Sequence, residues 1–144
     1  MEEAKFCRHR LLWWLYTAFI FLAVAVKFDG SFEALKERME QGASVNLVPF
    51  RSIRIQWQHF ATAWGMRNML GNTLPFLPLG FLTPAAFPAL SPLRRFFPFA
   101  LGYILSIELF QLMTGLGSFD VDDILLNLLG ALFGYWLGRP AKAA

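Results

Sequence analysis

The sequence has little cysteine, little charge and no clustered cations. The single cysteine, Cys7, cannot form an intramolecular disulfide, and no CxxC motif or cysteine and histidine spacing suggests a structural zinc site. Charged residues make up only 16% of the 144 residues. No block of lysine and arginine interleaved with polar or aromatic residues forms a nucleic-acid surface. These absences exclude a disulfide scaffold, a zinc module and a nucleic-acid-binding protein.

Apolar residues take the place of the missing charge. They make up 56% of the chain, aromatic residues make up 17%, and the mean hydropathy is +0.45, above that of a soluble domain. A soluble protein would have to bury nearly all of the 16 phenylalanines and 5 tryptophans in one core, whereas a bilayer accepts them on the outside. The composition predicts an all-α integral membrane protein, with residues 1–144 forming a single domain in contact with the lipid bilayer.

Four apolar stretches predict four transmembrane helices, at about 11–28, 68–90, 96–116 and 119–138. Each is close to the roughly 20 residues that cross ~30 Å of hydrocarbon at 1.5 Å per residue. The first stretch also fits a cleaved secretory signal, because it has a basic start and an Ala-Val-Ala run at 23–25. Trp13 and Trp14 favour an interfacial belt and therefore a retained span.

The short connections predict an orientation. Arg94 and Arg95 lie between the second and third spans, and Arg139 and Lys142 follow the fourth. Under the positive-inside rule, both termini of this multi-pass chain are expected to be cytoplasmic. The loop 29–67 then lies outside, although it carries lysines and arginines of its own.

The outer loop is expected to hold two amphipathic interfacial helices. Ser31 can cap a first helix over 32–41, lying flat on the membrane. The segment 51–64 allows a strand, because Ile53, Ile55 and Trp57 alternate. A longer match to one face of a helix favours a second interfacial helix, through Ile53, Trp57, Phe60, Ala61 and Trp64.

Polar residues of the fourth span share a stripe with glycines. At roughly 100° per residue, this stripe contains Asp120, Asp123, Asn127, Gly130, Gly134 and Gly138. Glycines four residues apart form the close-packing face of a membrane helix, so the stripe is expected to point into the bundle. Asp122 is expected to point elsewhere, toward water or headgroups, as a helix cap.

Polar residues of two other spans are expected to meet this stripe. Glu108 and Gln111 share one face of the third span, and a carboxyl group roughly 12 Å deep needs a partner or a proton. In the second span, Asn72 lies beside Pro75 and Pro78, which should kink the helix. Because consecutive spans alternate in direction, these residues gather at one membrane face.

Four motifs together resemble the VanZ-like family of bacterial membrane proteins. They are NLVPF at 46–50, N-x(3)-F-x-P-x-G-F from Asn72 to Phe81, E-x(2)-Q at Glu108 and Gln111, and FDVDDILLNLLGALFGY at 119–135. The resemblance implies a four-helix protein of the cytoplasmic membrane, in a family named for a member associated with resistance to the lipoglycopeptide teicoplanin. The positions carried over are Asn46, Pro49, Phe50, Asn72, Pro78, Gly80, Glu108, Gln111, Asp120, Asp123, Asn127 and Gly130.

The chain departs from the family pattern at one position. Many members have an arginine directly before the SFD-like run, where this chain has Gly117. If that arginine pairs with an acid or a phosphate, another cation must replace it here. Arg67 and Arg51 are the nearest candidates by topology.

Two functional hypotheses follow. In the first, a non-enzymatic pocket faces outward between spans two to four, fronted by Arg51, Arg54 and Arg67, and binds a cell-wall lipid precursor or an amphiphilic lipoglycopeptide without a cofactor. In the second, an enzyme acts on a lipid or isoprenoid phosphate, with Glu108 as general acid/base and a divalent cation on Asp120 and Asp123. The first is favoured, because a magnesium-dependent phosphate site usually shows more than two carboxylates.

Overall fold

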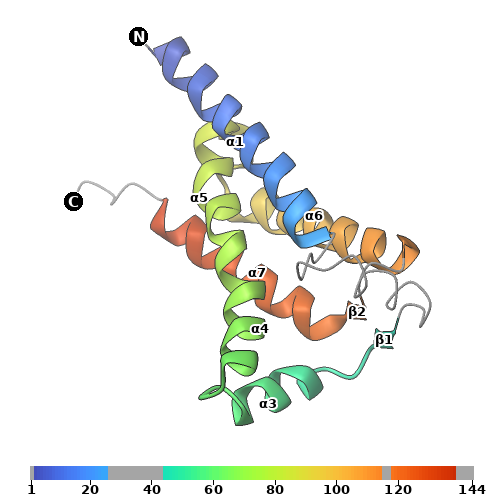
Figure 1. Cartoon of the computed structure of the whole chain (residues 1–144). Helices are drawn as coiled ribbons and strands as arrows, with labels where there is room; N and C mark the ends of the chain where they lie inside the picture. The colour runs from blue at the N-terminus through green and yellow to red at the C-terminus, as the bar shows by residue number, and fades with distance from the viewer. Residues whose placement is uncertain (1, 26–43, 115–117, 139–144) are drawn as a thin grey trace.

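The computed structural model describes residues 2–25, 44–114 and 118–138, and most of these residues are helical (Figure 1). The all-α fold class predicted from the sequence is confirmed. The helices are α1 (Glu2–Ala25), α3 (Arg51–Gln58), α4 (Ala63–Thr73), α5 (Leu77–Ala86), α6 (Leu93–Thr114) and α7 (Val121–Leu137), with 3-10 turns at Leu74–Phe76 and Pro88–Leu90. Strands β1 (Val45–Asn46) and β2 (Phe119–Asp120) form one short pair. The helix predicted over 32–41 lies outside the described residues.

Prolines break the second predicted span, as expected. The 3-10 turn at 74–76 separates α4 from α5, because Pro75 and Pro78 lack the N–H groups that would continue the α-helix. The rod formed by α4 and α5 is visible in Figure 1. At the break, the Tyr16 hydroxyl of α1 donates to the Pro75 carbonyl at 2.5 Å. A neighbouring helix therefore satisfies a polar backbone group at this point.

The glycine stripe of α7 packs directly on the backbone of α4 and α5. A Cβ atom added at Gly130 would lie 1.9 Å from the Thr73 carbonyl oxygen, and one at Gly134 would lie 1.9 Å from that of Leu77. In return, a Cβ atom at Gly80 of α5 would lie 1.9 Å from the Ala131 carbonyl oxygen. The predicted close-packing face is thus confirmed, and it brings the polar start of α7 against α4.

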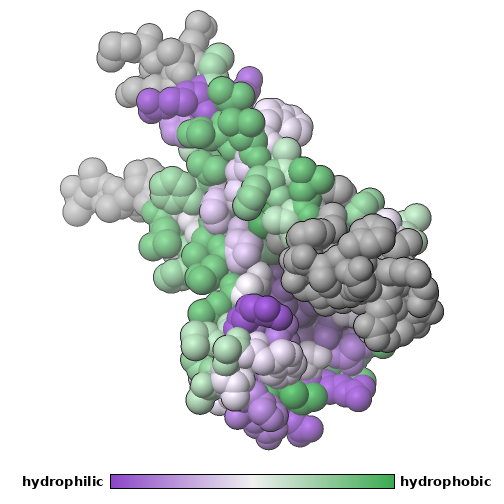
Figure 2. Space-filling model, in the orientation of Figure 1, coloured by the Kyte–Doolittle hydropathy of each residue, from purple (hydrophilic) through white to green (hydrophobic). Residues whose placement is uncertain are grey.

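Three contacts place the start of α1, the α5–α6 connection and the end of α7 at the same end of the molecule. Arg10 Nε donates to the Ala86 carbonyl at 3.3 Å, and the Tyr135 hydroxyl donates to the Ser91 carbonyl at 2.6 Å. The Phe96 and Tyr135 rings stack, with centroids 4.6 Å apart. The opposite end carries α3, the strand pair and the start of α7. Figure 2 shows hydrophobic side chains over the middle of the visible face and hydrophilic ones toward both ends.

Among the described helices, one is long and apolar enough to cross a membrane by itself. This helix is α6, with 22 residues from Leu93 to Thr114. Of the other predicted spans, α7 is shorter, the second is interrupted between α4 and α5, and α1 is charged at its start. The four-span arrangement therefore stays a prediction.

Candidate functional site

A strap of residues 45–53 lies on the first turn of α7. Strand β1 pairs in parallel with β2, with Val45 opposite Phe119 and Asn46 opposite Asp120. The Phe119 N–H also donates to the Ser44 carbonyl at 2.9 Å. The NLVPF motif and the FDVDD motif, far apart in the sequence, are therefore one structural unit.

Asp122 holds the strap, and the expectation that it faces water or headgroups is wrong. Its side chain is 0% exposed. Its two carboxylate oxygens accept the backbone N–H groups of Phe50 at 2.6 Å, Ser52 at 2.7 Å and Ile53 at 3.1 Å. These are N–H groups of the first turn of α3, which have no partner within their own helix, so an anion is stabilised there.

The backbone of Phe50 turns the strap into α3. Its φ of 63° lies in the left-handed region, which costs a non-glycine residue free energy. The turn lets the N–H groups on either side of Arg51 point at one carboxylate. The hydrogen bonds to Asp122 offset this local strain, so the unusual backbone and the buried acid belong together.

Asp120 joins the same unit by its side chain. Its Oδ1 caps α7 by accepting the Asp122 N–H at 2.9 Å, and it also accepts the Asn46 amide at 3.0 Å. Its Oδ2 accepts the Ser52 hydroxyl at 2.5 Å, and Asn46 donates to that hydroxyl at 3.1 Å. Sequence reasoning missed Ser52. The available signal was its place at the start of a helix, where serine commonly binds neighbouring polar groups.

Five of the polar side chains that the sequence directed into the bundle are buried on α4, α6 and α7, whereas Asp120, expected with them, joins the strap. We call these the buried polar cluster: Asn72, Glu108, Gln111, Asp123 and Asn127. The Asn72 amide donates to Asp123 Oδ1, and the Asn127 amide lies 3.5 Å from Glu108 Oε1. The two pairs are joined along α7, because Asp123 and Asn127 are one helical turn apart.

Three side chains of this cluster are fully buried. Glu108, Gln111 and Asn127 are each 0% exposed. The Oδ1 atom of Asn127 is buried and accepts no hydrogen bond from the described residues. An amide oxygen in this position has capacity for one further donor.

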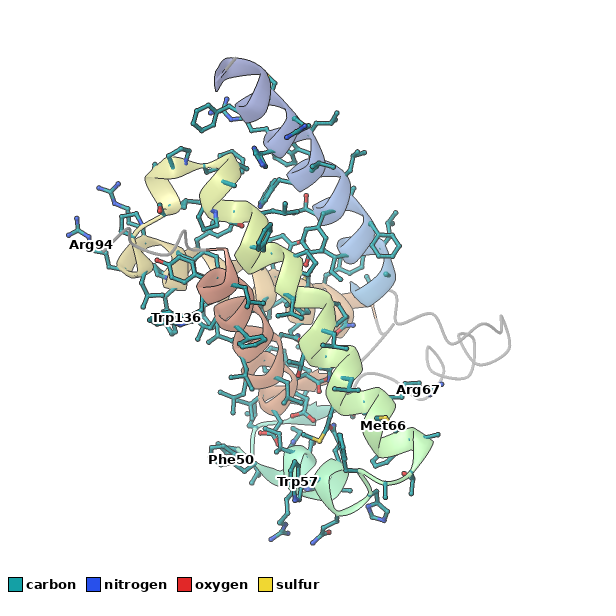
Figure 3. The ribbon with its side chains drawn as sticks, turned by 90° about the vertical axis from the view of Figure 1, so that its left-hand side faces the viewer. Phe50, Trp57, Met66, Arg67, Arg94 and Trp136 are labelled. Carbon is teal, nitrogen blue, oxygen red and sulfur yellow. The ribbon has the colours of Figure 1, made fainter. Side chains whose placement is uncertain are left out.

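The arginines expected at the pocket do not join the cluster. Arg51 and Arg54 are exposed on α3, and Arg67 is exposed on α4, where Figure 3 labels it beside Met66. Asn68, next to Arg67, donates its amide to the Trp64 carbonyl at 2.8 Å within its own helix. Positive charge therefore lies on the surface at this end, and the cluster lies below it.

The acids suggested for a divalent cation, Asp120 and Asp123, accept hydrogen bonds within the chain. Both oxygens of Asp120 already accept hydrogen bonds from the strap or from α7, and Asp123 accepts from Asn72. Within the part of the chain that the structure describes, no group of three or more histidine, cysteine, aspartate or glutamate residues could hold a metal ion. Hard cations require several oxygen ligands, and the contacts that the structure shows for these two carboxylates are hydrogen bonds within the chain.

The fold and the site define the class of protein: a helical protein with paired polar side chains buried between apolar helices. A family model described as VanZ/LLP1 matches residues 13–141, and the chain belongs to this family. It is similar to Protein VanZ of Enterococcus faecium, with 32% identity over 92 residues that cover 63% of this chain and 50% of that protein. The chain thus spans about half the length of this curated relative. No solved structure matches the chain.

Proposed function

We propose that the chain is a multi-pass protein of the bacterial cytoplasmic membrane, with four spans and cytoplasmic termini. The spans are α1, the broken rod of α4 and α5, α6 and α7. The apolar length of α6 and the VanZ/LLP1 family match support this assignment. Exposed apolar side chains on α1, including Leu11, Leu15, Phe19 and Leu22, also suit contact with lipid tails.

Its proposed activity is binding of a lipid-linked or amphiphilic polar ligand at the end of the bundle that carries the strap. The observation that carries this proposal is the buried polar cluster. Polar and ionisable groups inside a membrane bundle are costly and mark ligand or ion sites by default. The free acceptor of Asn127 calls for a hydroxyl, amide or ammonium donor, which sugar and peptide headgroups supply.

The cellular role that follows is a contribution to teicoplanin-type resistance. A protein that binds either the cell-wall lipid precursor or the lipoglycopeptide would reduce the amount of drug that reaches the precursor at the membrane. The similarity to Protein VanZ supports this direction. The enzymatic alternative would use the Glu108 carboxyl as its general acid/base, and its two aspartates accept hydrogen bonds from the strap and from Asn72 in the structure.

Teicoplanin susceptibility and binding test the proposal together. We expect expression of the native chain in a sensitive bacterial host to raise the inhibitory concentration of teicoplanin. Asn127→Leu should remove most of this increase, because it keeps the branched shape of the side chain and replaces both polar atoms by methyl groups. Native mass spectrometry of the purified protein with teicoplanin or a polyprenyl-linked wall precursor should show the same loss of complex.

Two further variants separate the hypotheses. Asn68→Ala is the matched control, because the Asn68 amide bonds within its own helix, and it should retain both readouts. Glu108→Gln keeps an acceptor for Asn127, so a binding role predicts a partial effect, whereas acid/base catalysis predicts near-total loss. The proposal would be contradicted if Asn127→Leu kept full resistance and full binding at the same membrane abundance as the native chain.

A further inference from the structure

Helix α3 faces inward with its polar side and outward with its aromatic and cationic side. Ser52 points to Asp120, and Gln56 is the buried residue of this helix. Arg51, Arg54 and Trp57 are exposed, and Trp57 is 67% exposed. An amphipathic helix on a soluble protein shows the reverse arrangement, with its apolar side on the core.

The inverted orientation is fixed by specific bonds. Three backbone N–H groups at the start of α3 are held by Asp122, and the Ser52 hydroxyl is held by Asp120. The free energy of these hydrogen bonds to carboxylates exceeds what burial of the Trp57 ring would contribute, because each charge-assisted bond is roughly twice as strong as a neutral one. The exposed aromatics are thus a consequence of how α3 is anchored.

The outward residues form a continuous surface, which we call the α3 surface: Phe50, Arg51, Arg54, Ile55 and Trp57. Phe50 is 66% exposed, and Figure 3 shows it at the edge of the molecule beside α3. The Trp57 ring stacks with Phe60, with centroids 5.8 Å apart. Aromatic rings flanked by arginines are the side chains that suit the headgroup level of a membrane.

Nothing acidic offsets the arginines of this surface in the neighbouring sequence. No aspartate or glutamate occurs from residue 41 to residue 107. Among the described residues, the acids in contact with α3 are Asp120 and Asp122, which are buried on its opposite side and accept its hydrogen bonds. The outward charge of α3 is therefore positive, and its complement is an anion.

We propose that the α3 surface binds the headgroups of anionic phospholipids. The two guanidinium groups would contact lipid phosphates, for which their planar fork geometry is suited, while Phe50, Ile55 and Trp57 enter the interfacial layer. This inference rests on the outer face of α3 and is independent of the buried polar cluster, so either proposal can fail alone.

The test measures lipid binding by the full chain in neutral detergent. Native mass spectrometry and thermal unfolding are followed while phosphatidylglycerol or phosphatidylcholine is added. We expect phosphatidylglycerol to bind more tightly and to raise the melting temperature, and high salt to reduce the difference. Removing each arginine should weaken binding about fivefold, the equivalent of ~1 kcal/mol per basic residue near an anionic surface.

The double variant R51Q/R54Q is compared with R94Q/R95Q, which removes two exposed arginines at the other end of the molecule. The first pair should lose most of the preference for phosphatidylglycerol, and the second should keep it. Equal losses in both pairs would overturn the inference, as would a preference that survives R51Q/R54Q. Inorganic phosphate at matched concentration should give no shift, and a full shift with phosphate would identify an ion site instead of a lipid surface. Unfolding without lipid checks that both variants keep the native fold.

Discussion

Three acids at the start of α7 do three different things. Asp120 caps its own helix and binds the strap, Asp122 receives the N–H groups of α3, and Asp123 accepts from Asn72. All three are buried or nearly so. Buried carboxylates are tolerated here because each has hydrogen-bond donors. Residue identity at this turn is therefore set by partners in separate parts of the chain.

Replacing Asp122 by asparagine should destabilise the protein. The variant keeps one acceptor oxygen and places an NH2 group against backbone N–H groups, so at least one charge-assisted bond is lost and a donor meets a donor. We expect the free energy of unfolding, measured by denaturant titration in mixed micelles, to fall by about 2 kcal/mol or more.

Asp123→Asn is the matched control for this change. The same chemical replacement one residue later leaves an oxygen that can still accept from Asn72, so its effect should be smaller. Equal stability of Asp122→Asn and the native chain would contradict the assigned role of the strap contacts.

The polar residues could be predicted from sequence where their partners lie on facing helices. Helical spacing placed Asp123 and Asn127 on the inner stripe and Glu108 opposite them, and the structure pairs Asn127 with Glu108. The same spacing failed for Asp122. Counting degrees around one helix locates its faces, but the partner of Asp122 is a strap 70 residues earlier, which no local pattern reveals.

At the scale of elements, glycine governs how α7 meets the broken rod of α4 and α5. Gly134→Ala would place a methyl group 1.9 Å from the Leu77 carbonyl oxygen, so the two backbones must separate. We expect a loss of about 3 kcal/mol or failure to accumulate in the membrane. Unfolding in detergent and quantified membrane abundance measure the two outcomes.

Gly102→Ala provides the comparison within α6. No atom lies within 4 Å of a Cβ built at Gly102, and alanine favours a helix over glycine by up to about 1 kcal/mol. This variant should be neutral or more stable. If Gly134→Ala and Gly102→Ala behaved alike, close helix contact would not explain the glycine stripe.

The ends of helices could be predicted where one residue determines them by its own chemistry. They could not be predicted where the apolar spacing continues past the end of the helix. The proline break was predictable because Pro75 lacks an N–H group. The helix expected over 51–64 ends at Gln58 instead. Thr62 then caps α4 by accepting the Gly65 N–H at 3.2 Å. The apolar spacing continues through this turn, so periodicity alone could not locate the end of α3.

At the scale of the whole molecule, the two ends carry different chemistry and predict a sidedness. Starting from a Cys7→Ser chain, the single-cysteine variant His59→Cys should react with an impermeant thiol reagent in whole cells. Ser91→Cys, and Cys7 in the native chain, should react only after permeabilisation, because both lie at the end joined by the Arg10 and Tyr135 contacts. Labelling of His59→Cys and Ser91→Cys from the same side would refute the arrangement.

The strap also sets the order in which the protein can be completed during synthesis. The carboxylates that bind the start of α3 belong to residues translated about 70 positions later. Until the ribosome has released α7, the strap has no anchor and the glycine-facing backbone of α5 is uncovered. A chain truncated before residue 119 should therefore leave the N–H groups at the start of α3 without their carboxylate acceptor, and we expect such a chain to be degraded faster than the full chain.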